Sequence, residues 1–220
     1  MLELFQLPTS TKVHRNIPKN SFDEYTNAKQ KKLLTDLVYK ITWQNKLAPD
    51  TVNLSGKVLE EIQIIEVNLK RKQEIPEILE LIDKVTPYAI IFVVRHGEEY
   101  YLSASIKHLH PVKVNHSVID WTFQSEWLTD QNPTYQLKLR ENLDFVFFDF
   151  CKQLSGFAND HKLKSLTALA DKSRLLDQLL KEVKKLKSAL SSCKQYNRKV
   201  ELNLELNEVL KKLDILKRMS

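Results

Sequence analysis

The hydrophobic pattern of the first fifty residues predicts an extended arm followed by a helix. Residues 1–20 contain two prolines and few periodic apolar positions, which is typical of an arm without regular structure. Ser21 can cap a helix, and Glu24, three residues later, completes a capping box. The apolar residues that then recur at helical spacing are Leu33, Leu34, Leu37, Val38 and Ile41. We expect this helix to end before Pro49.

The pattern between residues 60 and 154 predicts a mixed sheet of about four strands with covering helices, an α+β fold. The alternation over residues 60–70 slips in phase near Ile64, which indicates a strand buried on both faces or a bulge. His96 and Gly97 separate two β-branched and aromatic runs, which is the clearest hairpin signal in the chain. The expected strands are 60–70, 88–95, 99–107 and 114–124, and the expected helices are 75–85 and 135–154.

Two leucine-rich stripes at helical spacing distinguish the C-terminal region from the rest of the chain. The first stripe runs from Leu175 to Leu190 and the second from Val200 to Leu216, with the polar segment 191–197 between them. Such a pattern is typical of an antiparallel helical hairpin, or of coiled-coil segments that pair with a partner. We therefore expect an arm at 1–20, an α+β domain at 21–158, and a helical hairpin or coiled-coil tail at 159–220.

Charge is distributed unevenly between these regions. Residues 161–220 carry 15 Lys and Arg against 7 Asp and Glu, a net charge of +8. Residues 1–160 carry 19 basic and 21 acidic residues, a net charge of −2. The high isoelectric point therefore belongs to the tail, and any contact with nucleic acid or another acidic surface is expected there.

Composition excludes several classes of protein. The chain has only three glycines, so no glycine-rich phosphate loop or dinucleotide fingerprint can be written, and no cofactor is expected. Its two cysteines, Cys151 and Cys193, form neither a disulfide framework nor a zinc motif. No signal peptide or membrane-spanning run is recognisable, so we expect a cytoplasmic protein that contacts no membrane.

Three histidines form the best candidate for a metal site. His108 and His110 are two residues apart on a predicted strand, so their imidazoles project from the same face, and His116 follows closely. Histidines at a strand end before Pro111 are more often exposed turn residues. The expectation is therefore that no native metal is bound.

The strand that carries Glu66 and Lys70 permits a comparison with metal-dependent nucleases, which place an acid and a Glu-x-Lys motif on neighbouring strands, although the spacing here is Glu-x-x-x-Lys. Glu66 and Lys70 share a face of the predicted strand, and Asp83 or Glu61 could supply the second acid for a magnesium ion. The alternative interpretation is the solvated edge of an amphipathic strand. These residues are candidates for a catalytic site only on the first interpretation.

Two groups of residues are candidates for contact with nucleic acid. Lys181, Lys184, Lys185 and Lys187 form the densest cationic group in the tail, and they either contact phosphates or form a solvated helix face. Trp43 lies near basic residues at the expected end of the first helix. It either stacks on a base or closes the core.

Several short motifs are spread over most of the chain. They are IPK at 17–19, WQNKLAP at 43–49, Thr51-x-Asn53, EIQIIEVNLK at 61–70, and Ile82-Asp83 before YAIIFVV. Together they resemble a bacterial domain-of-unknown-function family, family 4391. Members of that family are similar in length and tend to be encoded near restriction-modification methyltransferase and helicase genes. The resemblance implies a role in defence against foreign DNA, but it implies no reaction and no catalytic residues.

The leucine stripes, the sparse motifs and the resemblance together favour a non-catalytic accessory or protein-interaction subunit of a DNA-acting defence or restriction-modification-like system. Residues 161–220 are expected to mediate self-association or to bind a partner protein, with DNA as a further candidate partner. Two alternatives stay open: a divergent metal-dependent nuclease, and a nucleic-acid-binding protein that uses the basic tail.

Overall fold

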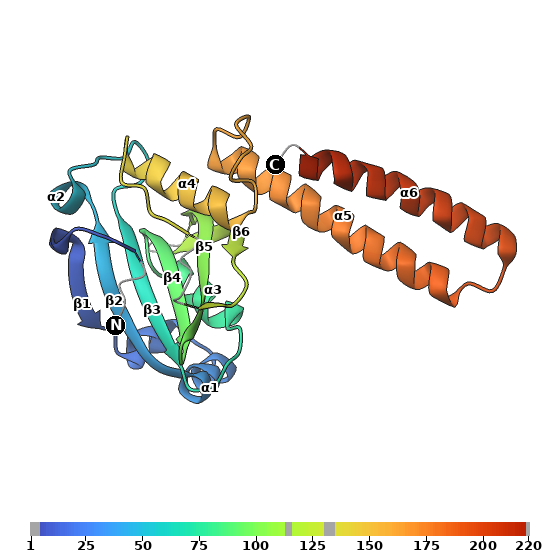
Figure 1. Ribbon diagram of the computed structural model, residues 1–220. Helices are drawn as coiled ribbons and strands as arrows, with labels where there is room; N and C mark the ends of the chain where they lie inside the picture. Colours follow the sequence, from blue (N-terminus) through green and yellow to red (C-terminus); the bar gives the residue numbers. More distant parts are fainter. Residues whose placement is uncertain (1–4, 113–115, 130–134, 219–220) are drawn as a thin grey trace. The chain divides into compact units, whose positions relative to one another are not determined.

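The computed structural model describes residues 5–112, 116–129 and 135–218, and the chain divides into two compact units. The first unit is Met1–Ser155 and the second is Gly156–Ser220. The first contains a mixed sheet with helices, and the second contains two long helices (Figure 1). The predicted α+β class and the C-terminal helical pair are therefore confirmed.

Within the described residues, the first unit contains a seven-stranded sheet. Its strands follow the order β1-β2-β3-β4-β5-β6, and β7 also pairs with β5. The pair β3–β4 is parallel and every other pair is antiparallel. The strands are β1 (Lys12–Asn16), β2 (Val38–Leu47), β3 (Ile62–Leu69), β4 (Ala89–His96), β5 (Glu99–Leu109), β6 (Ser117–Gln124) and β7 (Leu128–Thr129). The prediction of about four strands is wrong.

Two of the missed strands, β1 and β2, lie at one edge of the sheet. Residues 12–16, expected to belong to an extended arm, pair antiparallel with β2. The expected helix ends at Leu37, and the chain continues directly into β2. Val38 and Ile41 fit a helical stripe, but they also belong to a β-branched and aromatic run that favours a strand. Pairing with β3 along the length of β2 decides between these two patterns.

The helix α1 (Ala28–Leu37) begins later than the sequence predicted. Its capping box is formed by Asn27 and Gln30, whose side chains each accept a hydrogen bond from the backbone N–H of the other residue. Ser21 and Glu24 lie instead in the 3₁₀ helix η2 (Lys19–Tyr25). The remaining short helices are η1 (Thr9–Thr11) and α2 (Pro49–Val52).

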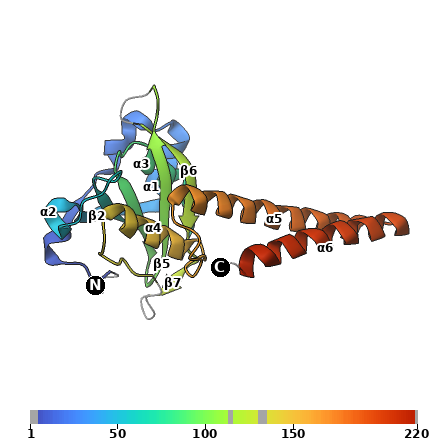
Figure 2. The same cartoon turned by 90° about the horizontal axis from the view of Figure 1, so that it is seen from above.

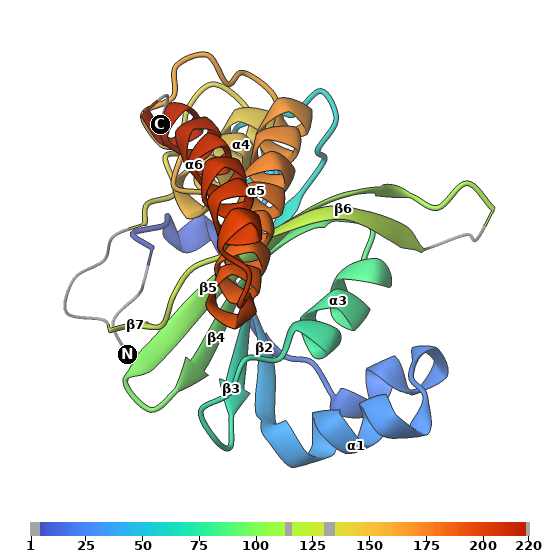
Figure 3. The same cartoon turned by 90° about the vertical axis from the view of Figure 1, so that its right-hand side faces the viewer.

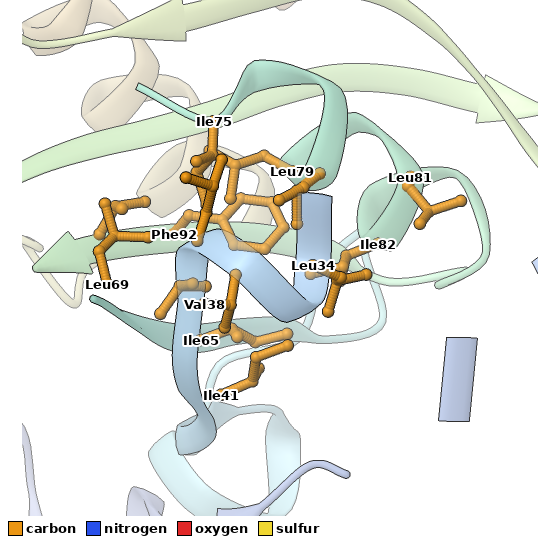
Figure 4. Close-up of a cluster of buried hydrophobic side chains, with 14 of the residues drawn as sticks. Leu34, Val38, Ile41, Ile65, Leu69, Ile75, Leu79, Leu81, Ile82 and Phe92 are labelled. Atoms are coloured by element: carbon orange, nitrogen blue, oxygen red, sulfur yellow. The ribbon is translucent and has the colours of Figure 1, made fainter. Parts of the chain in front are cut away.

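Helices cover both faces of the sheet. Figures 2 and 3 show α1 and α3 (Pro76–Lys84) on one face and α4 (Leu143–Leu154) on the other. On the first face, buried side chains gather around Phe92 (Figure 4). They come from α1, α3 and the strands, and they include Leu34, Leu37, Ile65, Val67, Ile78, Leu79, Ile82, Ile90, Phe92 and Val94. Because α4 covers the other face, β3 is buried on both faces, as one reading of its phase slip predicted.

Asp144 in the first turn of α4 anchors the loop that precedes β3. Its carboxylate accepts hydrogen bonds from the backbone N–H groups of Lys57, Val58 and Leu59. Gly56 begins this loop, and a Cβ atom placed on it would lie 2.1 Å from the carbonyl oxygen of Leu59. The loop can therefore close on Asp144 only with glycine at position 56.

The second unit is a helical hairpin, in which α5 (Leu166–Ser192) and α6 (Tyr196–Arg218) lie side by side (Figure 1). Its apolar interface contains Leu179, Val183, Leu186, Leu202, Leu206, Val209 and Leu213. The segment before α5 is held by an ion pair of 2.6 Å between Asp160 and Lys172, both buried. No helix in the described part of the chain is long and apolar enough to cross a membrane.

Candidate functional site

A buried polar cluster lies at the carboxyl ends of the two parallel strands. Arg95 Nε lies 3.3 Å from Glu66 Oε2, and the two side chains are only 10% and 8% exposed. The amide nitrogen of Asn68 donates a hydrogen bond of 2.8 Å to the other Glu66 oxygen. The Arg95 guanidinium also lies over the ring of Tyr100, 4.9 Å from its centroid.

The sheet register explains why these four side chains meet. Asn68 on β3 is paired with Arg95 on β4, and Arg95 is paired in turn with Tyr100 on β5. Glu66 is two residues before Asn68, so it projects from the same face. That face is opposite to the one that carries Ile65, Val67 and Phe92, and it is therefore the face that α4 covers.

The arrangement stabilises charge that would otherwise be costly to bury. A carboxylate removed from water requires a paired cation and hydrogen bonds to its remaining lone pairs. Arg95 supplies the cation for Glu66, and Asn68 supplies a hydrogen bond to the second oxygen. Both oxygens of Glu66 are thus engaged by neighbouring side chains, one by Arg95 and the other by Asn68.

The other residues of the nuclease hypothesis lie elsewhere. The Lys70 ammonium donates a hydrogen bond of 2.7 Å to the Thr35 carbonyl in α1, the helix that covers the opposite face. Asp83 lies in α3, also on that opposite face. Glu61 lies before the start of β3 and accepts a hydrogen bond from Gln63. The structure does not bring these acids and Lys70 together with Glu66.

Asp83 forms a second buried ion pair, with Lys107 of β5. The Lys107 ammonium lies 2.6 Å from Asp83 Oδ1, and it also donates to the backbone carbonyls of Asp83 and Thr86 at the end of α3. Burial raises the pKa of Asp83 and lowers the pKa of Lys107, because loss of solvation disfavours both charged forms. This pair ties α3 to the sheet.

The backbone N–H of His110 donates a hydrogen bond of 2.8 Å to the carbonyl of His116, but the side chains of the three candidate histidines have separate contacts. His108 Nδ1 lies 2.9 Å from Asp120, and His110 Nδ1 accepts a hydrogen bond from the backbone N–H of Val112. The His116 ring contacts Tyr25 edge-on. Among the described residues, no group of three or more His, Cys, Asp or Glu side chains is placed to hold a metal ion.

Trp43 was expected at the end of the first helix, but it lies in a strand. It lies within β2, between Arg15 on β1 and Ile65 on β3, and it is half-buried. Its indole N–H donates to the backbone carbonyl of Asn45. Lys46 forms an ion pair of 2.9 Å with Asp50.

The hairpin presents a basic surface and an apolar surface. Lys181, Lys184, Lys185 and Lys187 are all exposed on α5. Lys181 pairs with Asp177, whereas no ion pair joins the other three lysines to a side chain that the structure describes. On α6, Val200, Leu204 and Ile215 are 44%, 61% and 62% exposed. We call these three residues the outer stripe of α6.

The outer stripe lies opposite the interface with α5. Each residue of an α-helix is rotated by about 100° from the last, so Val200, Leu204 and Ile215 fall within about 60° of one another. The buried residues Leu202 and Leu206 are rotated by about 160–200° from that face. The hairpin therefore buries one face of α6 and leaves these three apolar side chains exposed on the opposite face, together with polar residues.

A mixed sheet covered by helices and followed by a helical hairpin places the protein among α+β proteins that carry a helical appendage. The family model described as "Domain of unknown function (DUF4391)" matches residues 5–213. The chain therefore belongs to this family, as the sequence motifs indicated. No curated protein and no solved structure matches it.

The sequence analysis missed the partners of both buried acids, Arg95 and Lys107. Arg95 follows the β-branched run of β4, and a charged residue at that position is typical of the exposed end of a strand. Only the parallel register of β3 and β4 places Arg95 beside Glu66. The available signal was the alternation of Glu66 and Asn68, which puts two polar side chains on one face of a buried strand.

Proposed function

We propose that this protein is a non-catalytic interaction subunit that assembles through its helical hairpin and serves a DNA-acting defence or restriction-modification-like system. The observation that carries the proposal is the outer stripe of α6, which stays exposed although the hairpin has its own apolar interface. Large apolar side chains that stay exposed on one face of a helix are expected to pack against a partner. The DNA-acting context rests on the family resemblance.

Several features of the first unit support a non-catalytic role. Its buried acids are each paired with a cation, Glu66 with Arg95 of the neighbouring strand and Asp83 of α3 with Lys107 of β5. Burial raises the pKa of the Cys151 thiol well above its usual value, which disfavours the nucleophilic thiolate. A divergent nuclease would need Glu66, Lys70 and a second acid in one place, and they lie on different faces of the sheet. The contacts of Glu66 and Asp83 are those expected of residues that stabilise the fold.

The proposal predicts that Leu204→Glu removes the protein from its cellular complex. The substitution places a charge in the outer stripe, where burial against another protein would require its desolvation. Because Leu204 is exposed in the isolated chain, the fold is expected to be unchanged. The measurement is affinity purification of tagged full-length chains from cells that naturally carry the gene, with mass spectrometry of the proteins recovered. Asn203→Glu is the matched control, since it adds the same charge at an exposed neighbouring position.

A second candidate function, nucleic-acid binding, is favoured by the exposed lysines of α5. Lys184, Lys185 and Lys187 lie within four residues, and the net charge of residues 161–220 is +8. Such a surface can neutralise phosphates without reading the base sequence.

Replacing Lys181, Lys184, Lys185 and Lys187 with glutamate is expected to abolish binding of the full chain to duplex DNA at low salt. Wild-type affinity should fall steeply as salt rises, because phosphate contacts release counterions. Fluorescence anisotropy with a labelled duplex over a range of salt concentrations measures both effects. Binding that survives the substitution, or that does not depend on salt, would assign DNA contact to another surface or exclude this role for α5.

A further inference from the structure

The net positive charge of the chain is concentrated where the helical hairpin turns. Residues 181–199, which we call the hairpin tip, cover the end of α5, the connecting segment and the first turn of α6 (Figure 1). The hairpin tip carries seven Lys and Arg against one acid, Glu182, a net charge of +6. Because the whole chain also has a net charge of +6, all other residues together are neutral. A polyanion is therefore attracted to the hairpin tip more than to any other part of the chain.

An exposed aromatic ring lies on the same side of the hairpin tip as several of its lysines. Tyr196, the first residue of α6, is 79% exposed. At about 100° per residue, Lys184 and Lys187 are rotated by about 70–130° from the middle of the apolar interface on α5. Tyr196 and Lys199 are rotated in the same sense, by about 50–110°, from the middle of the interface on α6. In an antiparallel pair of helices, equal senses of rotation lead to the same side of the pair.

The opposite side of the hairpin tip has a different charge pattern. Arg198 is rotated from the α6 interface in the other sense, and it forms ion pairs of 2.6 Å with Glu201 and 3.9 Å with Glu205. Glu182 and Lys185 of α5 are also rotated in that other sense. On this side, acidic side chains therefore oppose the positive charges.

We call Lys184, Lys187, Tyr196 and Lys199 the basic flank. All four residues are exposed, and no ion pair joins the three lysines to a side chain in the part of the chain that the structure describes. Tyr196 is the one large apolar side chain exposed among residues 181–199. A protein interface has a core of several apolar side chains, whereas an interface with nucleic acid is more polar and strongly positive. The basic flank therefore fits nucleic acid better than another protein.

The position of the tyrosine narrows the kind of nucleic acid. Lysines can contact the phosphates of a duplex or of a single strand equally, without reading the sequence. An aromatic ring stacks on the face of a base, and the faces of the bases are covered by their neighbours inside a duplex. Tyr196 can therefore add to the affinity only where a base is unpaired.

We propose that the basic flank binds single-stranded nucleic acid, with its three lysines against the phosphates and one base stacked on the ring of Tyr196. The inference rests on the nucleic-acid-binding function proposed above, and it names the ligand of that function. Each phosphate contact with a single strand contributes about −0.7 to the slope of log affinity against log salt, so three lysines predict a slope of about −2. Stacking releases no counterion, so the ring raises the affinity without changing this slope.

The test is fluorescence anisotropy of the purified full-length chain with a labelled oligothymidylate and with a blunt duplex of equal phosphate number. Tyr196→Ala should weaken binding to the single strand by roughly fivefold or more, with the salt slope and the duplex affinity unchanged. Tyr196→Phe should retain the wild-type affinity, because it keeps the ring. Lys187→Gln should make the salt slope shallower by about 0.7. Lys185→Gln is the matched control, since it removes the same charge from the opposite side and should leave the slope unchanged.

Two results would overturn the inference, provided that circular dichroism shows the variants to be folded. One is a Tyr196→Ala variant that binds the single strand as tightly as wild type does, and the other is an equal effect of Lys185→Gln and Lys187→Gln. If the duplex is still bound through the lysines of α5, the nucleic-acid-binding function stands with a different ligand. Binding of neither nucleic acid would contradict the inference and that function together, and capture of vesicles that contain phosphatidylserine would then assign the hairpin tip to an anionic lipid surface.

Discussion

Replacing Lys107 with methionine is expected to lower the free energy of unfolding by about 3–5 kcal/mol. The substitution leaves the Asp83 carboxylate buried without its cation, and it also removes the donor to two carbonyls at the end of α3. Urea denaturation followed by circular dichroism measures the loss. The double variant Asp83→Leu/Lys107→Met is the matched control, and it should recover most of the loss because no uncompensated charge remains.

The same variant should gain stability as the pH falls. In wild type, burial already raises the pKa of Asp83 above its usual value, and the loss of Lys107 must raise it further. A carboxyl whose pKa is higher in the folded state binds a proton more readily there than in the unfolded chain. Its destabilising effect is therefore full at neutral pH, and it diminishes as the pH falls through the folded-state pKa toward the unfolded value near 4. A deficit that is the same at pH 7 and pH 5 would contradict this account of the pair.

Gly56→Ala is expected to lower the free energy of unfolding by at least about 3 kcal/mol. The new methyl group would meet the Leu59 carbonyl oxygen at 2.1 Å, so the loop must move and weaken its hydrogen bonds to Asp144. A hydrogen bond to a charged group contributes about 1.5–3 kcal/mol, and three backbone amides are involved. Thermal or urea unfolding of the full chain measures the change.

Two comparisons isolate the cause of that loss. Gly97 lies in the β4–β5 turn with a φ of +62° and open space where a Cβ would lie, so Gly97→Ala should cost only about 1–2 kcal/mol. Asp144→Ala removes the carboxylate itself. If Gly56→Ala acts by displacing the loop from Asp144, the two losses should be far from additive in the double variant. Additive losses would assign the effect of Gly56 to a different contact.

The elements that could be predicted from the sequence are those whose pattern fits one period only. The run from Tyr88 to Arg95 and the turn at Gly97 fit a strand and a hairpin, and β4 and β5 follow them. The leucine stripes of the tail fit a helix, and α5 and α6 follow these. In such segments, local pattern and tertiary contacts favour the same structure.

Prediction failed where the apolar pattern fits both a helix and a strand, because strand pairing then determines which of the two forms. Val38 and Ile41 fit a helix as well as a strand, and only the neighbouring β1 and β3 select the strand. The helix expected over residues 135–154 is shorter in the structure. It begins only at Leu143, because the Asn142 side chain caps its first turn.

The polar clusters illustrate the same limit at the level of single residues. Glu66 and Lys70 share a face of the predicted strand, but the partner of Glu66 is Arg95, which lies 29 positions later on another strand. Sequence spacing gave no register for that pair, so Lys70 appeared to be the nearest basic partner. A parallel pairing through α3 brings Arg95 to Glu66 and leaves Lys70 to cap α1.

The central claim is that the hairpin assembles this protein into a complex through the outer stripe of α6, and the purification from native cells tests it most directly. The account predicts that wild type and Asn203→Glu recover the same DNA-acting proteins. It also predicts that Leu204→Glu recovers them at a level at least about tenfold lower, with an equal amount of folded chain. Equal recovery by all three chains, or recovery of no DNA-acting protein by wild type, would contradict it.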